Sequence, residues 1–509
     1  MYRKAPLVAA LAVTVLALTG CSQGKSVSLD GGSPASGKTL TVAIGGEPDQ
    51  LDPQKTSSYF SFEVLENVFD TLVQPNAKLQ MEPALATSWD VSTDHLTWTF
   101  HLRKGVKFQD GTSFSSADVV YSYNRIIDQK LANAWKFSSV KSVDANGADT
   151  VVIKLIQPTP NLLSNLGGFK GMAIVEKKNV ESGAIATKPV GTGPFALSKD
   201  VSGDHITLVA NKYYWGGNPK LAGVTYRFIS EPSTAVAALL SGEIDWTDVV
   251  PTQRVDQLKG DSSIRIGDTA SSDYWYLALN EAKAPWNNVK ARQAIAYAID
   301  RKAIVQAVSY GTAQLNELAI PKASYWYTNY NPYPDSADLK KAKQLMSEAG
   351  YSGGTLDFLA TSDYPETVTA AQIIAADLKP LGIDVNIRQT DFSTWLDEQN
   401  SGRFDMLMMG WLGNIDPDDF YYSQNHTDGS SNAQKYSNAE VDKLLDAGRV
   451  ETNQAARKEG YSQAAKIIAD QAGYIYLYNP AVVQAWSPEL HGYQVRADRA
   501  IRFKDAWLG

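Results

Sequence analysis

The segment 355–411 alternates short strand and helix patterns, and this alternation limits the fold more than any other feature of the chain. The pattern predicts strands over 355–360, 383–389 and 404–411, separated by helices over 366–379 and 394–400. Strands that alternate with helices in short units form parallel βαβ arrangements, which are typical of α/β domains. Open sheets of this kind bind ligands beyond the carboxyl ends of their strands, so we expect a ligand site in the loop that follows residue 411.

Periodicity and turn residues predict further elements outside this segment. Ser115 and Asp118 have the spacing of a capping box, which predicts a helix from there to about Ile127. Apolar and polar residues alternate over 39–44 and 96–102, as expected of half-buried strands. Turn residues and prolines bound two further predicted strands, over 106–108 and 151–155. The further predicted helices span 233–240, 288–298, 300–311 and 339–349.

The N-terminus has the features of an export signal. Arg3 and Lys4 precede an apolar run over 5–17, which is too short to cross a bilayer comfortably. The run ends in Leu18-Thr19-Gly20-Cys21, which resembles the lipobox of bacterial lipoproteins and implies cleavage before Cys21 and acylation of its sulfur. Cys21 is the only cysteine, so it has no partner within the chain for a disulfide. The alternative is an uncut signal anchor with an incidental cysteine.

Composition and charge constrain the part of the chain beyond the signal. Residues 21–37 are mostly small and polar, which is typical of a flexible tether. The remaining length of about 470 residues is too great for one core and predicts two or three domains. The formal net charge is −8, or −10 once Arg3 and Lys4 are removed, and no basic cluster is available to follow phosphates. Nucleic acid is therefore not an expected partner.

Several motifs, taken together, resemble the periplasmic-type solute-binding proteins that serve peptide and nickel importers of the ATP-binding-cassette (ABC) class. The most specific region contains Trp98-Thr99-Phe100-His101-Leu102-Arg103-Lys104-Gly105-Val106-Lys107-Phe108. The resemblance covers essentially everything after the tether. The other matching stretches are 81–89, 118–122, 191–195, 242–245, 292–301, Gly410-Trp411 and Asp416-Pro417.

This resemblance implies an α/β, two-lobed, periplasmic-binding-protein-like clamshell of type II, in its large form with an inserted subdomain. Lobe I is expected over 38–273 and 480–509, with the subdomain at about 57–180, and lobe II over 274–479. The strands 274–280 and 474–480 are the expected hinge crossings. Ligand is captured between the lobes, the lobes close, and the closed form docks on a permease.

Two loops contain the candidate ligand-binding residues. Trp411 ends the predicted strand 404–411, and Asp416 and Tyr421 lie after it. A buried tryptophan and a helix-capping Asp-Pro explain Trp411 and Asp416 without a ligand. Gly45, Gly46 and Glu47 follow the first strand, at the matching place in the other lobe. These glycines would let a ligand approach the backbone, but a plain turn needs them equally.

Asn414 stands where the resemblance implies an aspartate that receives the ammonium group of a free peptide. The dipeptide-binding relatives also have an arginine for the ligand's carboxylate, whereas Thr361-Ser362-Asp363-Tyr364 offers none. Both charged anchors for a dipeptide are therefore expected to be missing. We predict weak binding of free dipeptides and tighter binding of longer or N-blocked peptides.

The predicted function is that of a lipid-anchored binding protein on the extracytoplasmic face of the cell membrane. It is expected to be a monomer that delivers a peptide or other small polar ligand to ABC permease subunits, without a cofactor. The 25 tyrosines and 12 tryptophans suit peptide contacts and also sugar stacking. An oligosaccharide or a nickel complex is therefore the alternative ligand, and a secreted hydrolase is the alternative class. The five histidines show no metal-ligand spacing, so no metal site is expected.

Overall fold

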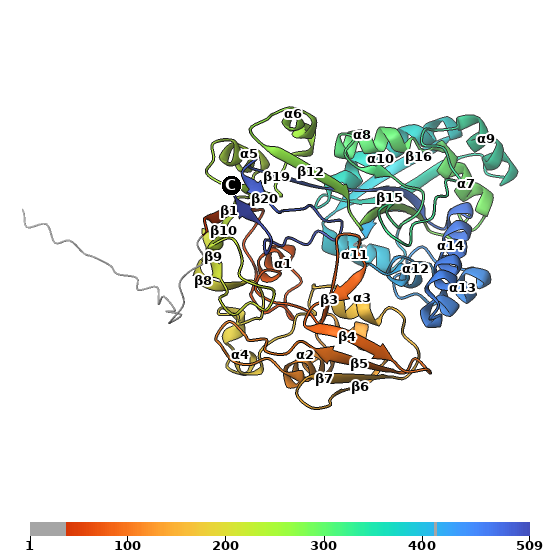
Figure 1. The fold of residues 1–509 in the computed structure, drawn as a ribbon. Helices are drawn as coiled ribbons and strands as arrows, with labels where there is room; N and C mark the ends of the chain where they lie inside the picture. Colours follow the sequence, from red (N-terminus) through yellow and green to blue (C-terminus); the bar gives the residue numbers. More distant parts are fainter. Residues whose placement is uncertain (1–36, 412–414) are drawn as a thin grey trace, which may run out of the picture. The chain divides into compact units, whose positions relative to one another are not determined.

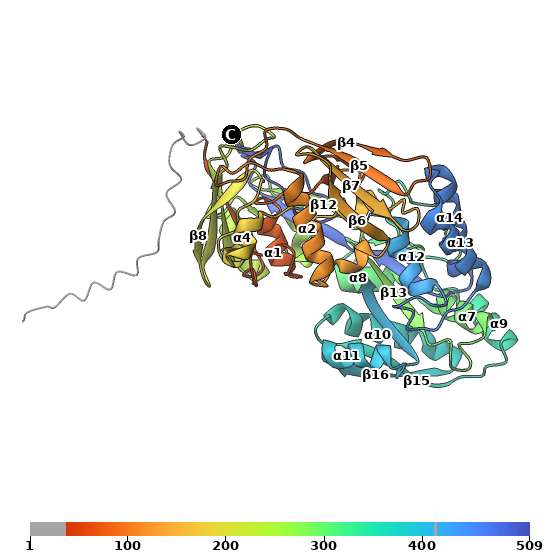
Figure 2. The same cartoon turned by 90° about the horizontal axis from the view of Figure 1, so that it is seen from below.

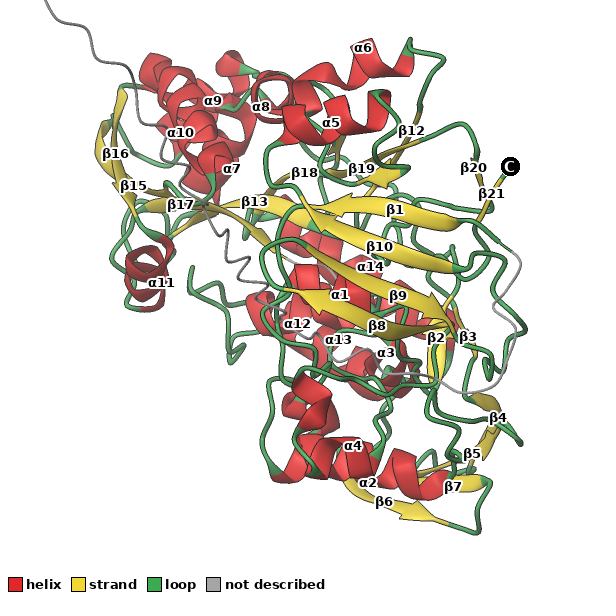
Figure 3. Cartoon of the chain, turned by 90° about the vertical axis from the view of Figure 1, so that its left-hand side faces the viewer, coloured by secondary structure: helices red, strands yellow, loops and turns green. Residues whose placement is uncertain are grey.

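The computed structural model describes residues 37–411 and 415–509, in which a seven-stranded sheet has the order β12-β19-β11-β1-β10-β9-β8 (Figures 1 and 3). β1 runs parallel to β10 and β11, and the other neighbours are antiparallel. Leu40, Val42 and Ile44 of β1 are buried in the main core on one face, while Ala43 packs beneath α5 and α6 on the other. The bounds are β1 Thr39–Ile44, β8 Phe195–Val201, β9 His205–Ala210, β10 Gly223–Phe228, β11 Trp246–Thr247, β12 Arg265–Ala270, β19 Ala481–Trp486, α5 Pro232–Leu240 and α6 Val255–Lys259.

A six-stranded sheet, in the order β14-β18-β13-β17-β15-β16, contains the segment that the sequence pattern singled out. β15 runs parallel to both β16 and β17, and α10 and α11 are the intervening helices, so the predicted parallel βαβ arrangement is confirmed. The bounds are β13 Tyr274–Leu279, β14 Gln314–Leu315, β15 Gly354–Thr361, β16 Ile383–Thr390, β17 Met406–Trp411, β18 Ile475–Asn479, α10 Pro365–Leu378 and α11 Phe392–Asn400.

Helices cover both faces of the six-stranded sheet. One face packs on α7 to α10 through alanine and branched aliphatic side chains. The other packs on α11 to α14 through a core rich in tyrosine, in which the rings of Tyr276 and Tyr474 stack with centroids 4.1 Å apart. The remaining bounds are α7 Val289–Ala298, α8 Arg301–Ser309, α9 Leu339–Glu348, α12 Pro417–Asn425, α13 Ala439–Val450 and α14 Gln454–Asp470.

An antiparallel four-stranded sheet, β4-β5-β7-β6, packs against α2 (Figure 2). α2 begins with the predicted capping box of Ser115 and Asp118. The predicted strand over 106–108 is wrong, because the turn at Asp110-Gly111 reverses the chain too soon and leaves only one bridge, between Lys107 and Ser113. The bounds are α2 Ser116–Asp128, β4 Ala86–Val91, β5 Thr97–Leu102, β6 Val140–Ala145 and β7 Thr150–Leu155.

The chain passes between the seven- and six-stranded sheets in two places. Residues 271–273 join β12 to β13, and Pro480 joins β18 to β19. The two connections lie side by side, because Ser271 donates its backbone N–H to the carbonyl of Pro480 at 2.8 Å. The strands expected as hinges therefore belong to the six-stranded sheet, and the crossing points lie at their ends.

The smaller elements complete the described chain. Two two-stranded sheets pair β2 with β3 and β20 with β21. Within residues 37–411 and 415–509, no helix combines the length and the apolar character that a bilayer crossing requires. The bounds are α1 Tyr59–Leu65, α3 Leu162–Gly167, α4 Lys177–Glu181, β2 Val73–Pro75, β3 Met81–Pro83, β20 Leu490–His491 and β21 Trp507–Leu508.

Candidate functional site

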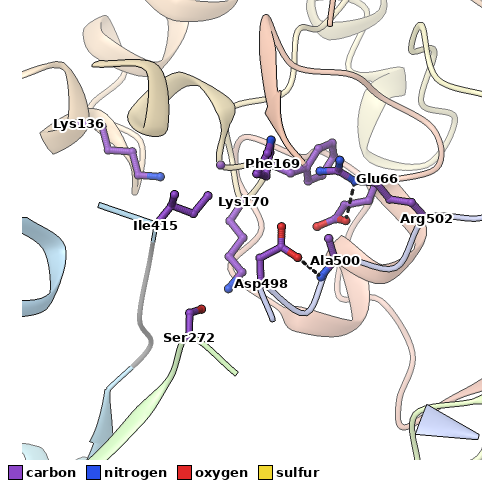
Figure 4. Close-up of a pocket in the computed structure, with 11 residues that line it drawn as sticks. Glu66, Lys136, Phe169, Lys170, Ser272, Ile415, Asp498, Ala500 and Arg502 are labelled. Atoms are coloured by element: carbon purple, nitrogen blue, oxygen red, sulfur yellow. Dashed lines mark hydrogen bonds and ion pairs between the residues drawn. The ribbon is translucent and has the colours of Figure 1, made fainter. Parts of the chain in front are cut away.

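A small cavity lies beside the connections between the two largest sheets (Figure 4). Its volume is about 40 Å³. Since one water needs about 10–15 Å³ by this measure, a larger ligand enters only if the walls move apart. Its lining comes from segments far apart in sequence and includes both the Ser272 crossing and Ile415, which lies two residues before α12. The lining residues are Glu66, Pro75, Lys136, Gly168, Phe169, Lys170, Ser272, Ile415, Asp498, Ala500 and Arg502.

The acidic groups of the cavity each have a cationic partner. Arg502 Nε lies 3.6 Å from Glu66 Oε2, and Arg496 donates to Asp498 at 2.7 and 2.9 Å. Burial raises the pKa of Glu66 to about 7, and Arg502 opposes that rise. Burial also acts to raise the pKa of Asp498, but the hydrogen bonds and charge of Arg496 prevail and hold it below its ordinary value.

The basic wall of the cavity consists of Lys136 and Lys170. Lys136 lies on a 3₁₀ turn, Ala134–Phe137, whose carbonyl at Lys136 accepts a hydrogen bond from Asn165 Nδ2 at 3.2 Å. The residue after Lys170 packs closely against the start of this turn, since a Cβ at Gly171 would lie 2.1 Å from Nδ2 of Asn133, the residue before the turn. Gly171 also has a positive φ of 84°, which favours glycine. This close packing holds both lysines on one wall.

Asp416 forms a buried ion pair that lies apart from the cavity lining. Its two carboxylate oxygens accept hydrogen bonds from Arg457 at 2.6 and 2.7 Å, and Oδ1 also caps α12 by accepting the N–H of Asp418 at 3.0 Å. Both side chains of the pair are less than one-tenth exposed. The helix-capping interpretation of Asp416 is confirmed, and both of its oxygens are engaged within the protein.

Trp411 and Tyr421 belong to the tyrosine-rich core of the six-stranded sheet. Tyr421 is 1% exposed, and partly buried Trp411 packs on the same core opposite Tyr274 of β13. Neither residue is among those that line the cavity.

Gly45, Gly46 and Glu47 follow β1 as expected but face other partners. A Cβ on Gly46 would come within 2.7 Å of the Phe60 ring, so the two glycines make room for this aromatic side chain. Glu47 is exposed and its Oε2 accepts the backbone N–H of Gly203 at 3.0 Å, in the turn between β8 and β9. These contacts account for the three residues without a ligand.

Cys21 and Asn414 lie outside the described residues. Among those described, no group of three or more His, Cys, Asp or Glu side chains is placed to hold a metal ion. His426 is buried, stacks on Tyr422 at 4.6 Å between ring centroids, and has its Nε2 3.4 Å from Asp446 Oδ1.

Comparison with known proteins decides the family. The family model of bacterial extracellular solute-binding proteins, family 5 (Middle), matches residues 80–432. The chain belongs to this family. It is similar to heme-binding protein A of Haemophilus influenzae, with 30% identity over 95% of each chain. It is also similar to the periplasmic murein peptide-binding protein MppA of Escherichia coli, with 28% identity over 90% of each.

A solved structure supports the same assignment. The periplasmic binding protein DppA of Helicobacter pylori, in complex with the peptide STSA, has a TM-score of 0.76 and 31% identity, over 93% of this chain and 98% of that one. The expected α/β, two-lobed, periplasmic-binding-protein-like fold is thus confirmed. Ligand pockets occur preferentially at domain interfaces, so this cavity is the candidate ligand site.

Sequence reasoning missed Lys136, Lys170, Ser272 and Arg502 as cavity residues. None of them lies in a motif with chemical meaning, and folding alone brings their segments together. Only Ser272 could have been indicated by the topology, because it lies in the crossing that directly precedes β13.

Proposed function

We propose that this chain is the ligand-capturing subunit of an ABC importer, and that it delivers a peptide to the membrane permease. The observation that carries the proposal is the cavity at the junction of the two sheets in a chain of the family 5 solute-binding class. The division into lobe I (38–273 and 480–509, with a subdomain at about 57–180) and lobe II (274–479) belongs to this proposal. The paired connections at 271–273 and Pro480 support it.

Peptide is the ligand class best supported. DppA was solved with the peptide STSA, and MppA is named for murein peptide. Asp416 is committed to Arg457, and no arginine lies at 361–364, so the charged anchors expected for a free dipeptide are not available at these positions. Longer or N-blocked peptides are therefore the preferred ligands, held by backbone hydrogen bonds and aromatic contact.

Heme is the second ligand to consider, because a similar relative is named for it. Heme iron is bound in proteins by histidine, cysteine, methionine or tyrosine. None of these side chains is among the described residues that line the cavity. The donor set therefore favours a ligand held by charge and hydrogen bonds over one held through iron.

Membrane attachment through Cys21 completes the proposed function. The sequence Leu18-Thr19-Gly20-Cys21 and the small polar residues up to 37 suit a lipid anchor followed by a tether. An acylated chain held this way would remain on the extracytoplasmic face, within reach of a permease.

Calorimetric titration tests the ligand assignment. The full chain in detergent is titrated with acetyl-Ala-Ala-Ala and with the dipeptide Ala-Ala, and each mixture is then examined for cleavage by mass spectrometry. We expect the blocked peptide to bind at least tenfold more tightly, with no turnover. Tighter binding of the free dipeptide contradicts the ligand preference, and hydrolysis of either peptide contradicts a pure binding role.

A further inference from the structure

The cavity has an excess of positive charge on one wall. Arg502 and Glu66 form one ion pair, and Asp498 is bound by Arg496. Among the residues described, neither Lys136 nor Lys170 has a carboxylate oxygen within 4.0 Å of its Nζ. Figure 4 shows Lys136 extending toward Ile415 and Lys170 extending toward Ser272.

The ammonium group of Lys170 also affects that of Lys136. Burial lowers the pKa of Lys136 below its ordinary value, and the charge of Lys170 lowers it further. Only Asp419, in the first turn of α12, acts in the opposite direction. Two like charges placed together in a partly desolvated site are costly, and an anion between them removes much of that cost.

We propose that Lys136 and Lys170 form a carboxylate-binding wall, and that the protein selects peptides by a negative charge. This inference rests on the proposed peptide-binding function. Lysine ammonium groups are compact charges with three donors each, which suits a carboxylate approached from two sides. The carboxylate comes either from the C-terminus of the peptide or from an acidic side chain. A carboxylate anchor on this wall also fits the state of Asp416, which is bound to Arg457 and is therefore not free to receive an ammonium group.

Both lysines lie in the same part of the chain, the proposed inserted subdomain. The tight packing of the loop at Gly171 against Asn133 fixes their spacing within the proposed inserted subdomain. A role limited to holding the lobes together would require only Lys136, opposite Asp419. Lys170 acts instead on Glu66 of the same cavity, because its charge opposes the rise in the pKa of that carboxyl.

Three N-acetylated peptides test the inference by titration calorimetry on the full chain in detergent: Ala-Ala-Ala as the free acid, Ala-Ala-Ala amide, and Ala-Glu-Ala amide. Charged hydrogen bonds of this kind correspond to roughly tenfold in affinity or more. We expect the free acid to bind about tenfold more tightly than its amide. Tight binding of Ala-Glu-Ala amide would assign the carboxylate to a side chain, whereas its weak binding would assign it to the C-terminus.

Variants distinguish a specific role of the two lysines from a general effect of positive charge. Lys136→Met and Lys170→Met each keep the aliphatic stem and should weaken binding of the preferred acid about tenfold while leaving the amide unchanged. Lys141→Met removes an exposed charge from β6 in the same subdomain and should change neither.

The outcomes distinguish this inference from the function on which it rests. Equal affinity for the acid-bearing and neutral peptides overturns the carboxylate wall while peptide binding stands. An equal loss with Lys136→Met and Lys141→Met also overturns it. No binding of any of the three peptides refutes the peptide function, and the inference fails with it.

Discussion

Asp416→Asn separates a structural role for this residue from a ligand-binding one. The substitution keeps the size of the side chain and an oxygen that caps α12, but it removes the negative charge opposite Arg457. Arg457 is 3% exposed and would remain buried with its hydrogen bond to the Gly448 carbonyl at 2.7 Å and with aromatic contacts to Trp326 and Tyr461.

Breaking a buried ion pair from one side costs about 3–5 kcal/mol. Because asparagine keeps the cap and one acceptor, we expect the lower end, about 3 kcal/mol. For a lobe of about 200 residues this corresponds to a fall in Tm of about 6–12 °C. Differential scanning calorimetry measures it, with Asp384→Asn on the exposed edge of β16 as the matched charge control.

Ligand affinity provides the complementary measurement. Since both oxygens of Asp416 face Arg457, affinity for acetyl-Ala-Ala-Ala should change less than twofold at a temperature where the variant is folded. A Tm equal to that of the Asp384→Asn control, combined with a large loss of affinity for peptides with a free amine, would refute the structural assignment. Asp416 would then be the amine anchor.

Three further predictions concern export, closure and pH. Cys21→Ala should release the chain from the membrane or leave its signal uncut; unchanged membrane association and unchanged mature mass would contradict lipidation. Saturating peptide should reduce the radius of gyration in small-angle scattering by motion about residues 271–273 and Pro480, and identical curves with and without peptide would argue against this hinge. The pKa of Glu66 is raised to about 7, so the folded chain binds a proton that the unfolded chain has released. The free energy of unfolding should therefore fall by up to about 3 kcal/mol as pH rises from about 4.5 to 7. Glu66→Gln should flatten this slope in denaturant titrations, and an unchanged slope would contradict the raised pKa of the buried Glu66 carboxyl.

Local signals were enough to predict many individual elements. The strand at Thr39–Ile44 and the capping box at Ser115 depend on neighbours a few residues away, and both match the structure. The parallel arrangement over 354–411 was also predictable, because strand and helix periods alternate there without interruption. The short strand at 106–108 was not, since two adjacent turn residues outweighed its apolar pattern.

The prediction of the site was limited because the sequence does not reveal which residues far apart in the chain pair with each other. The Asp-Pro pair at 416–417 predicts a helix cap, and that cap is present. Its partner Arg457, however, lies 41 residues away on α14, where no motif indicates a buried cation. The sequence therefore left Asp416 open as a ligand anchor, and only the packing of α12 against α14 commits it to Arg457.

The buried charges in and near the cavity obey one physical rule. A buried charge needs a partner, and the protein supplies one for Asp416, Asp498 and Glu66. Lys136 and Lys170 are the lining charges for which no such close pair is present among the described residues. A ligand that brings a carboxylate to this wall would complete the same pattern of pairing. A ligand that brings only an ammonium group would add a third positive charge, and that difference is the physical basis for the proposed selectivity.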